Sequence, residues 1–329
     1  MDLKDIQKNY SSLLEETNSL IRQHLLSLAP QSEKLRATLE ASRGKQLRPL
    51  FTYSLFKGFR VPTDDAPRLA AVFESIHIAS LLHDDVIDKC HLRRNMPTMN
   101  GIYGDAVAIL LGDLVFVAIY RLAASLKQIW LIEEVNKTVH RLIEGELLQQ
   151  QQRFNEETKE NQYQDIIARK TAALLELCSY ASARFAGRSE QDANLIKRFA
   201  HHFGIIFQIV DDWADFCRSD KKDHKNRGVD IANGFLTLPW LILLEKCSPK
   251  EKVHLHKIIT EKQPAGLNHR EILMLSEKYE LSQLVEQRIN DHSIQCREAL
   301  QQVSDFDSSE MLVYLEFINR EFNNISDKK

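Results

Sequence analysis

Hydrophobic residues recur at spacings of three and four along most of this chain, which is the period of an amphipathic α-helix. Strand-like alternation of apolar and polar residues is scarce, and only 11 glycines and 8 prolines interrupt the 329 residues. The pattern predicts helices over residues 13–28, 69–86, 106–126, 130–148, 163–186, 196–215, 236–247 and 272–300.

The segments between these helices are polar and contain the helix-breaking residues. They fall near residues 58–67, 91–104, 155–162, 218–234 and 248–268. None is long or biased enough in composition to separate domains, and no repeat of fixed period is present. We predict one all-α domain over residues 1–329, built as a bundle of long helices.

Two copies of the pattern DDxxD stand inside apolar helical sequence. The first contains Asp84, Asp85 and Asp88, and the second contains Asp211, Asp212 and Asp215. Carboxylates four residues apart project from one face of a helix, about 6 Å apart along its axis. Like charges about 4 Å apart repel by about 4 kcal/mol at an effective dielectric constant of 20, so such pairs need a cation.

The ligand type selects that cation. Both copies offer oxygen ligands without a nearby set of Cys or His, and this favours Mg²⁺, which is commonly shared between carboxylates and substrate phosphates. A single DDxxD is equally compatible with a solvated helix face or with helix caps. Two copies in apolar surroundings favour a Mg²⁺-dependent site for a diphosphate.

Basic residues, which a diphosphate site also needs, occur at four places. They are Lys45 and Arg48 at the entry to a helix, Arg93 and Arg94 after the first acidic copy, Lys170 in mid-helix, and Lys225 after the second copy. Each one alone is compatible with an ordinary surface charge, and Lys170 with a side chain that reaches water from a helix edge. Together with both acidic copies they indicate a phosphate site.

Composition limits the setting of such a site. The net charge of −3 argues against a general nucleic-acid binder. The five cysteines show no CxxC spacing, which predicts free thiols in a reducing compartment and no zinc site. The N-terminus lacks the features of a signal peptide, and the longest apolar stretch, residues 106–120, is interrupted by Gly112 and Asp113. A cytoplasmic protein without a transmembrane segment is expected.

In their order along the chain, these segments resemble the trans-isoprenyl diphosphate synthases, the polyprenyl synthetase family, and within it the long-chain octaprenyl type. The segments are GKQLRP (44–49), HIASLLHDDVIDKCHLRR (77–94), GD (112–113), KTA (170–172), QIVDDWADF (208–216), and KNRGVD with GFLTLP (225–239). The resemblance implies helices around a deep central cavity, usually in a homodimer, with three Mg²⁺ ions between the acidic motifs and an allylic diphosphate. It further implies condensation of isopentenyl diphosphate with farnesyl or geranylgeranyl diphosphate, without an organic cofactor.

The resemblance also implies a role for each matching residue. Asp84 and Asp88 would bind two of the metals and Asp211 the third, with Asp85, Asp212 and Asp215 as supporting or water-mediated ligands. The allylic diphosphate would be held by Arg93, Lys170 and Lys225, and that of isopentenyl diphosphate by Gly44, Lys45, Arg48, His77 and Arg94. Thr171 and Gln208 would lie beside the allylic carbons, where oxygen dipoles favour a developing carbocation.

Three positions depart from the family pattern. Arg43 with Gly44 replaces the usual glycine pair, Gln46 replaces a frequent basic residue, and Phe235 stands where the family commonly has a Lys that contacts the allylic diphosphate. Loss of that cation is expected to weaken substrate binding or ionisation by about 1–3 kcal/mol, the scale of a charged hydrogen bond. Slower turnover or a higher KM is expected, and not inactivity.

The residues one turn before the first motif bear on product length. Ala79 and Ser80 are small, where enzymes with short products place a bulky side chain. Volume exclusion by a close-packed wall then predicts a product of about C30 to C45, octaprenyl-like, for a quinone side chain. Phe116 or Tyr120 could close the far end of the cavity, although core packing accounts for either one. Release of so apolar a product allows peripheral membrane contact.

Three alternatives to this function stay open. They are a short-chain synthase of farnesyl or geranylgeranyl diphosphate, a non-catalytic subunit of a hetero-oligomeric synthase, and a terpene cyclase. The second DDxxD argues against the cyclase, and the presence of both acidic motifs argues against the non-catalytic subunit.

Overall fold

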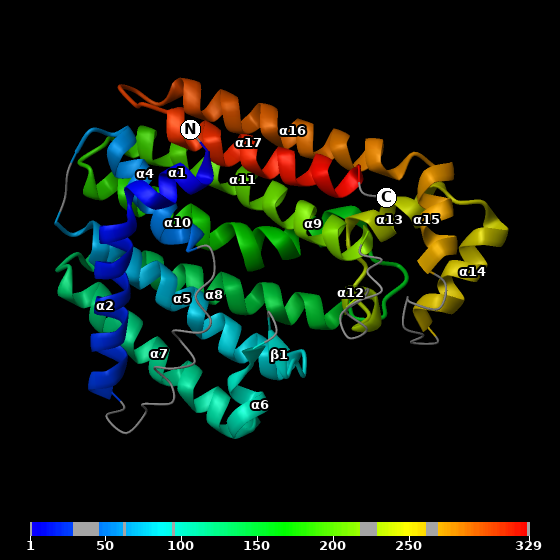
Figure 1. The fold of residues 1–329 in the computed structure, drawn as a ribbon, viewed down its shortest axis with the longest axis horizontal. Helices are drawn as coiled ribbons and strands as arrows, with labels where there is room; N and C mark the ends of the chain where they lie inside the picture. Colours follow the sequence, from blue (N-terminus) through cyan, green and yellow to red (C-terminus); the bar gives the residue numbers. More distant parts are fainter. Residues whose placement is uncertain are drawn as a thin grey trace. The chain divides into compact units, whose positions relative to one another are not determined.

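The computed structural model describes residues 2–28, 46–61, 64–93, 96–217, 229–260 and 269–327, which are almost entirely helical (Figure 1). The α-helices are α1 (Leu3–Asn9), α2 (Ser11–Leu28), α4 (Leu47–Gly58), α5 (Ala66–Ile87), α6 (Met99–Tyr103), α7 (Asp105–Ser125), α8 (Ile129–Gln151), α9 (Glu160–Ile167), α10 (Ala173–Phe185), α11 (Glu190–Cys217), α12 (Val229–Ala232), α13 (Leu238–Lys246), α14 (Pro249–Thr260), α15 (His269–Lys278), α16 (Leu281–Gln302) and α17 (Ser309–Ser326). A π-helical segment, η1 (Ala168–Ala172), lies between α9 and α10, and β1 (Leu92–Arg93) pairs antiparallel with β2 (Met96–Pro97). The predicted all-α fold is confirmed.

The chain divides into two compact units. The first comprises Met1–Val139, Leu174–Lys197 and Val303–Val313, and the second comprises His140–Ala173, Arg198–Gln302 and Tyr314–Lys329. The first acidic motif belongs to the first unit and the second acidic motif to the second unit. The single domain over residues 1–329 stays a prediction.

The first unit is built around α5. Leu69, Phe73 and Ile76 on this helix have no exposed surface. A helix that is buried on every side is a core element, and α5 packs against α2, α4 and, most extensively, α7. Figure 1 shows α5 and α7 side by side. From His77 onwards half-buried residues appear among the buried ones, so the helix brings the first acidic motif to the edge of this packed core.

Helix α7 agrees with the helix predicted over residues 106–126. It runs unbroken for 21 residues through Gly112 and Asp113, the two residues that interrupt the apolar stretch of the sequence. Gly112 is required by packing, because a Cβ atom there would lie 2.2 Å from Nε2 of His83 on α5. Among the described helices, α7 is the one long and apolar enough to cross a membrane by length and composition, with a mean hydropathy of 2.1 and 44% of its window buried.

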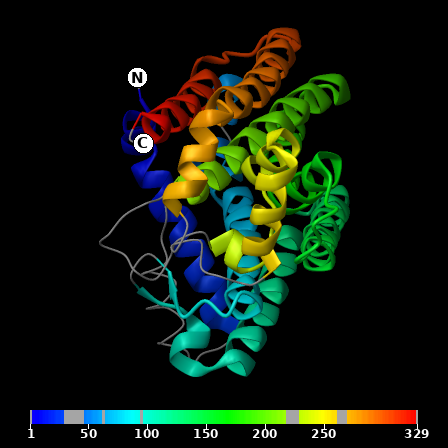
Figure 2. The same cartoon turned by 90° about the vertical axis from the view of Figure 1, so that its right-hand side faces the viewer.

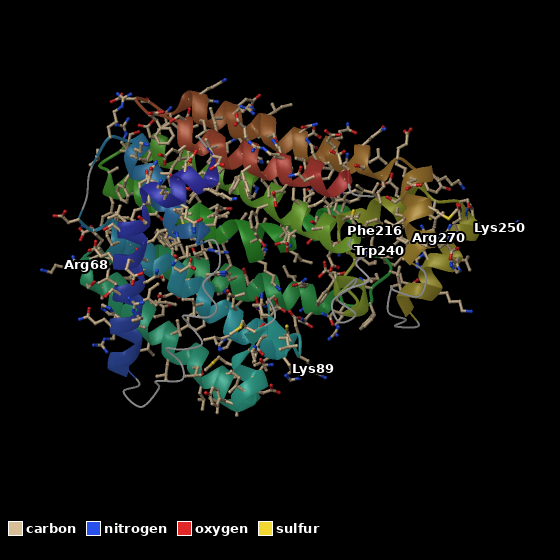
Figure 3. The ribbon with its side chains drawn as sticks, viewed as in Figure 1. Arg68, Lys89, Phe216, Trp240, Lys250 and Arg270 are labelled. Atoms are coloured by element: carbon tan, nitrogen blue, oxygen red, sulfur yellow. The ribbon has the colours of Figure 1, made fainter. Side chains whose placement is uncertain are left out.

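Aromatic rings form much of the core of the second unit. Trp213 on α11 is fully buried and stacks on Phe216, with ring centroids 5.6 Å apart. Trp240 on α13 meets Phe216 edge-on at 5.3 Å, and both are labelled in Figure 3. Helices α13 and α15 each pack against α16, which is orange in Figure 2. Since Trp213 directly follows Asp212, this packing fixes the helix turn that carries the second acidic motif.

Two of the predicted helices are divided in the structure, and α1, α4, α6, α12, α14 and α17 lie outside the predicted ranges. The predicted helix over 163–186 contains η1, and that over 272–300 breaks at Glu280, whose φ of 50° ends a regular helix. Helix α14 lies where a connection was predicted. Helix α17 follows the same periodicity that predicted the others, with Met311, Tyr314, Leu315, Ile318 and Phe322 buried along one face.

A histidine pair in the second unit makes folding stability depend on pH. Nδ1 of His202 on α11 lies 2.9 Å from Nδ1 of His292 on α16, so one ring donates and the other accepts. Burial lowers the pKa of His202 to about 4, and burial also lowers the pKa of His292. A histidine in the unfolded chain has a pKa of about 6.5, so below that pH the unfolded state binds more protons than the folded state. Folding stability therefore falls as the pH drops towards about 4.

Replacement of His202 by Asn should flatten that dependence. We expect the wild-type free energy of unfolding to fall by about 1–2 kcal/mol between pH 7.5 and pH 5, after allowance for solvent screening, and the variant to lose less. Urea unfolding at both pH values measures the difference. The exposed His140 provides the control variant His140→Asn, which should behave like wild type. Equal pH dependence in wild type and His202→Asn would contradict the assignment.

Candidate active site

The first acidic motif occupies the C-terminal end of α5. Asp88 caps the helix, and its N–H donates to the Asp84 carbonyl at 2.8 Å, so helical geometry persists through the whole motif. Asp84 and Asp88 therefore share a face, as their spacing predicts, and both are half-buried. Asp85 differs from them because it is only 7% exposed. The outer carboxylates are thus placed for a ligand, while the middle one belongs to the packed interior.

Asp85 holds Arg93. The guanidinium of Arg93 on β1 donates from Nε at 3.0 Å and from Nη2 at 2.8 Å to Oδ1 of Asp85. Asn100 on α6 donates to the Asp85 carbonyl at 3.0 Å. Burial raises the pKa of the Asp85 carboxyl, and the charge and hydrogen bonds of Arg93 oppose that rise. Arg93, a candidate for the allylic diphosphate, is therefore held in a fixed position by the first motif.

The two small residues before the motif differ in their surroundings. Ala79 is fully buried, whereas Ser80 is half-buried and donates from Oγ to the His77 carbonyl at 2.9 Å. His77 itself is half-buried. The side chain of Ala79 is thus enclosed by packed neighbours, and its place in a tunnel wall stays a prediction.

Arg48 on α4 lies in an enclosed setting that includes Glu74 of α5. Enclosure lowers the pKa of the Arg48 guanidinium, and the charge of Glu74 opposes the shift. Glu74 is only 9% exposed. Burial also raises the pKa of the Cys178 thiol, which interacts with both charges and stays protonated at neutral pH. Glu74 is an acidic neighbour of a candidate phosphate-binding residue.

The carboxylates of the second acidic motif show the same pattern of burial as those of the first. Asp211 is exposed and Asp215 is half-buried, whereas Asp212 is only 4% exposed. Asp212 accepts hydrogen bonds from the Tyr163 hydroxyl at 2.5 Å and from Nε2 of Gln208 at 2.8 Å. Burial raises the pKa of its carboxyl above the usual range, and the Asp211 and Asp215 charges add to the rise. The middle carboxylate is again the buried one, and its part in metal binding stays a prediction.

A further carboxylate joins this motif in the second unit. The N–H of Asp230 on α12 donates to Oδ2 of Asp215 at 3.3 Å. Burial, followed by the charges of Asp212, Asp215 and Asp211, raises the pKa of the Asp230 carboxyl, and Lys170 opposes the rise. Negative charge is therefore concentrated at these carboxylates. The ammonium group of Lys170 is near enough to lower the pKa of Asp230.

Lys170 lies on the π-helical segment η1. Nζ of Lys170 donates to Oε2 of Glu146 at 2.5 Å and to Oε1 of Gln149 at 2.7 Å, both on α8. The next residue, Thr171, donates from Oγ1 to Oε1 of Gln208 at 2.6 Å. Single π-helical turns are frequent at functional sites, because the wider turn re-aims the side chains that it carries. Three candidate residues, Lys170, Thr171 and Gln208, are thus brought together.

Two glycines allow neighbouring helices to approach this segment. A Cβ atom at Gly145 on α8 would lie 2.8 Å from the backbone N of Lys170. A Cβ atom at Gly204 on α11 would lie 2.7 Å from Cα of Ala172. Any side chain at either position would push its helix away from η1. The glycines therefore set the distance between Lys170 and its partners on α8, and between Thr171 and Gln208.

Comparison with known proteins identifies this arrangement. The sequence model of the family described as polyprenyl synthetase matches residues 31–274. The chain belongs to the polyprenyl synthetase family. The resemblance seen in the motifs is thereby confirmed, as is the prediction of a prenyltransferase. The residue assignments within the site stay predictions.

Relatives of this polyprenyl synthetase include enzymes with long and with short products. It is 32% identical to an octaprenyl diphosphate synthase of Haemophilus influenzae over 73% of each chain. It is 28% identical to a short chain isoprenyl diphosphate synthase of Methanothermobacter thermautotrophicus over 96% of this chain and 97% of the relative. A crystal structure of a polyprenyl synthase from Caulobacter crescentus, complexed with calcium and isoprenyl diphosphate, superposes with a TM-score of 0.84 at 25% identity, over 98% of this chain and 97% of that one.

Sequence reasoning did not single out several residues of this polyprenyl synthetase that interact with candidate site residues of their own unit. They are Glu74, Glu146, Gln149, Tyr163 and Asp230. A signal was present for two of them, because Glu146 lies in the helix predicted over residues 130–148 and Gln149, three residues further on, shares its face once the helix continues. Gly44, Lys45, Arg94 and Lys225 lie outside the described residues.

Proposed function

We propose that this polyprenyl synthetase condenses isopentenyl diphosphate with an allylic diphosphate to give a medium- or long-chain, octaprenyl-like product of about C30 to C45. The close-packed wall of the cavity would set the upper limit of that length. The proposal rests mainly on one observation, the two helix faces that carry Asp84 with Asp88 and Asp211 with Asp215. Similarity to the octaprenyl diphosphate synthase supports the length. The homodimer and the cytoplasmic location stay predictions.

The residues present fit Mg²⁺. Among the described residues, no three His, Cys, Asp or Glu side chains are grouped closely enough to hold a metal ion by themselves. Each motif instead offers its outer carboxylates. After burial, the charges of Asp211 and Asp215 raise the pKa of both Asp212 and Asp230, as crowded negative charge does before a cation binds. We propose that Asp84 and Asp88 hold two of three Mg²⁺ ions and Asp211 the third. When bound, Mg²⁺ would draw charge from the leaving diphosphate.

The chain's own side chains complete the chemistry that we propose. Arg93 and Lys170 would bind the allylic diphosphate, and Arg48 with His77 that of isopentenyl diphosphate. As the allylic C–O bond breaks, the oxygens of Thr171 and Gln208 would face the developing positive charge. A new C–C bond then forms, and a proton leaves to the released diphosphate. The hydrogen bond between Thr171 and Gln208 supports this role, because it fixes both dipoles before the reaction.

Replacement of Ala79 by Phe should shorten the product to about C15 to C20, because the added ring would take the volume of further prenyl units. Ala79 is fully buried, so the ring should also cost about 1–3 kcal/mol of folding stability. Chromatographic sizing of the dephosphorylated products measures the length. Ser80→Phe tests the same wall from a half-buried position. An unchanged product in both variants would remove this helix turn from the wall.

The experiment that tests the proposed function is a product assay. The purified protein would be incubated with Mg²⁺, labelled isopentenyl diphosphate and farnesyl diphosphate, and the products dephosphorylated and sized. A ladder that ends well beyond C20 supports the proposal. Products that stop at C20 would indicate a short-chain synthase. No extension from any allylic primer would contradict the proposal and direct attention to a missing partner subunit.

A further inference from the structure

The segment that ends at Phe235 is tied to the second acidic motif. The N–H of Phe235 donates to the Asp230 carbonyl at 2.8 Å, and the N–H of Asp230 donates to Oδ2 of Asp215 at 3.3 Å. Phe235 is only 8% exposed. The backbone from Asp230 to Phe235 is therefore held against the carboxylates of α11, and a charge carried on this segment would act on any ligand bound there.

Arg153, which follows the end of α8, lies over this segment. Its Nε donates to the Asn233 carbonyl, and its Cζ stands 5.8 Å from the centroid of the Phe235 ring. Its neighbour Phe154 donates from N–H to the Gly234 carbonyl at 2.7 Å. Gly234 has a φ of 84°, and a Cβ atom there would lie 2.6 Å from the Phe154 ring. The guanidinium is thus held by the Asn233 carbonyl near two aromatic rings, because its Cζ also stands 5.3 Å from the centroid of the Phe154 ring.

The charge of Arg153 is available, in contrast to the charges of comparable residues in the second unit. Arg169 pairs with Asp165 at 2.9 Å, and Arg288 pairs with Glu160 at 2.8 Å. Within the described ranges, no carboxylate forms an ion pair with Arg153, and the residue is exposed. A guanidinium that is oriented but not neutralised is a donor set for a phosphate group.

We propose that Arg153 binds the diphosphate of the allylic substrate and supplies the cation that Phe235 does not provide. The inference rests on the proposed function. The ring of Phe235 serves as a flat support for the guanidinium, a cation–π arrangement that leaves the N–H groups along its edge free to reach phosphate oxygens. Arg153 is then a substrate-binding residue, and the substitution of Lys by Phe at position 235 is compensated from another helix.

Arg153→Gln should weaken diphosphate binding without abolishing the reaction. We expect the KM for farnesyl diphosphate, and the Kd of the inert analogue farnesyl thiodiphosphate with Mg²⁺, each to rise about tenfold, the effect of one charged hydrogen bond. Arg153→Lys keeps the charge, so its KM and Kd should lie between those of wild type and of Arg153→Gln. Arg288→Gln is the matched control, since Arg288 is already paired with Glu160, and it should stay within about twofold of wild type.

A rescue experiment separates this role from anchoring of the backbone. Phe235→Lys in the Arg153→Gln protein should restore the Kd of the analogue to within about threefold of wild type, because the new ammonium group would stand on the same segment as the lost guanidinium. Loss without rescue, accompanied by a lower melting temperature, would assign Arg153 to anchoring and overturn the inference. An unchanged Kd in Arg153→Gln would also overturn it. A wild-type protein that neither binds the analogue nor extends a primer would instead contradict the proposed function.

Discussion

Replacement of Asp84 by Asn should lower kcat by about a thousandfold, because a ligand that loses its charge no longer offsets that of a divalent cation. The carboxamide has nearly the same volume, and Asp84 is half-buried at the end of α5, so the melting temperature should change by only a few degrees. Elongation of labelled isopentenyl diphosphate, measured across a range of Mg²⁺ concentrations, gives kcat and the apparent affinity for the metal.

Asp65 provides the control for this variant. It caps the other end of α5 and pairs with Arg68 on the exposed surface at 3.1 Å. Asp65→Asn removes the same charge from the same helix and should leave kcat within about twofold. Asp85→Asn differs from both, because it would weaken the paired hydrogen bonds from Arg93 and should lower stability as well as activity. Wild-type activity in Asp84→Asn would exclude the first motif as the metal site.

Replacement of Gly145 by Ala should lower both activity and stability, against the usual effect of this substitution. In a helix interior, Gly to Ala ordinarily stabilises by about 0.5–1 kcal/mol. Here the new methyl group would lie 2.8 Å from the backbone N of Lys170 and 2.9 Å from Cβ of Arg169. We expect a loss of about 1–3 kcal/mol in the free energy of unfolding. Displacement of Lys170 by about 1 Å should reduce kcat/KM by about 100-fold.

Urea unfolding and steady-state kinetics measure the two effects of Gly145→Ala. Leu147→Ala is a suitable control, because Leu147 lies on the same helix, is 57% exposed and should tolerate truncation. An Ala variant that is more stable than wild type and fully active would show that α8 can shift without disturbing η1. The position of Lys170 would then have to be set by the hydrogen bonds to Glu146 and Gln149 alone.

The sequence contains enough information to place the outer aspartates but not the middle ones. Period and spacing put Asp84 with Asp88, and Asp211 with Asp215, on shared helix faces, and the structure agrees for the first pair through the bond from Asp88 to the Asp84 carbonyl. The middle residue of each motif is also an aspartate, but its carboxylate is buried and hydrogen-bonded to another side chain. Whether it meets Arg93 or Tyr163 depends on side chains that arrive from another element, which no local pattern encodes.

The π-helical turn shows the same limit more sharply. Periodicity predicted one helix over residues 163–186, and the structure has three consecutive helical segments there. A π turn is a matter of one residue in the register of backbone hydrogen bonds, whereas the hydrophobic period is averaged over many residues. By contrast, the buried residues of α17 are three and four apart, so the same periodicity would have predicted this helix. Its omission was an error of interpretation and not a limit of the sequence.

The wide turn at Ala168–Ala172 also bears on how such a helix can change over generations. A π turn equals an α-helix with one residue inserted, so deletion of a single codon within it would restore ordinary hydrogen bonding to the whole segment. The shorter helix would rotate every side chain before the deletion by about 100° relative to those after it. The shorter helix would be more regular, but the side chains on the two sides of the deletion could not all keep the contacts that they now make.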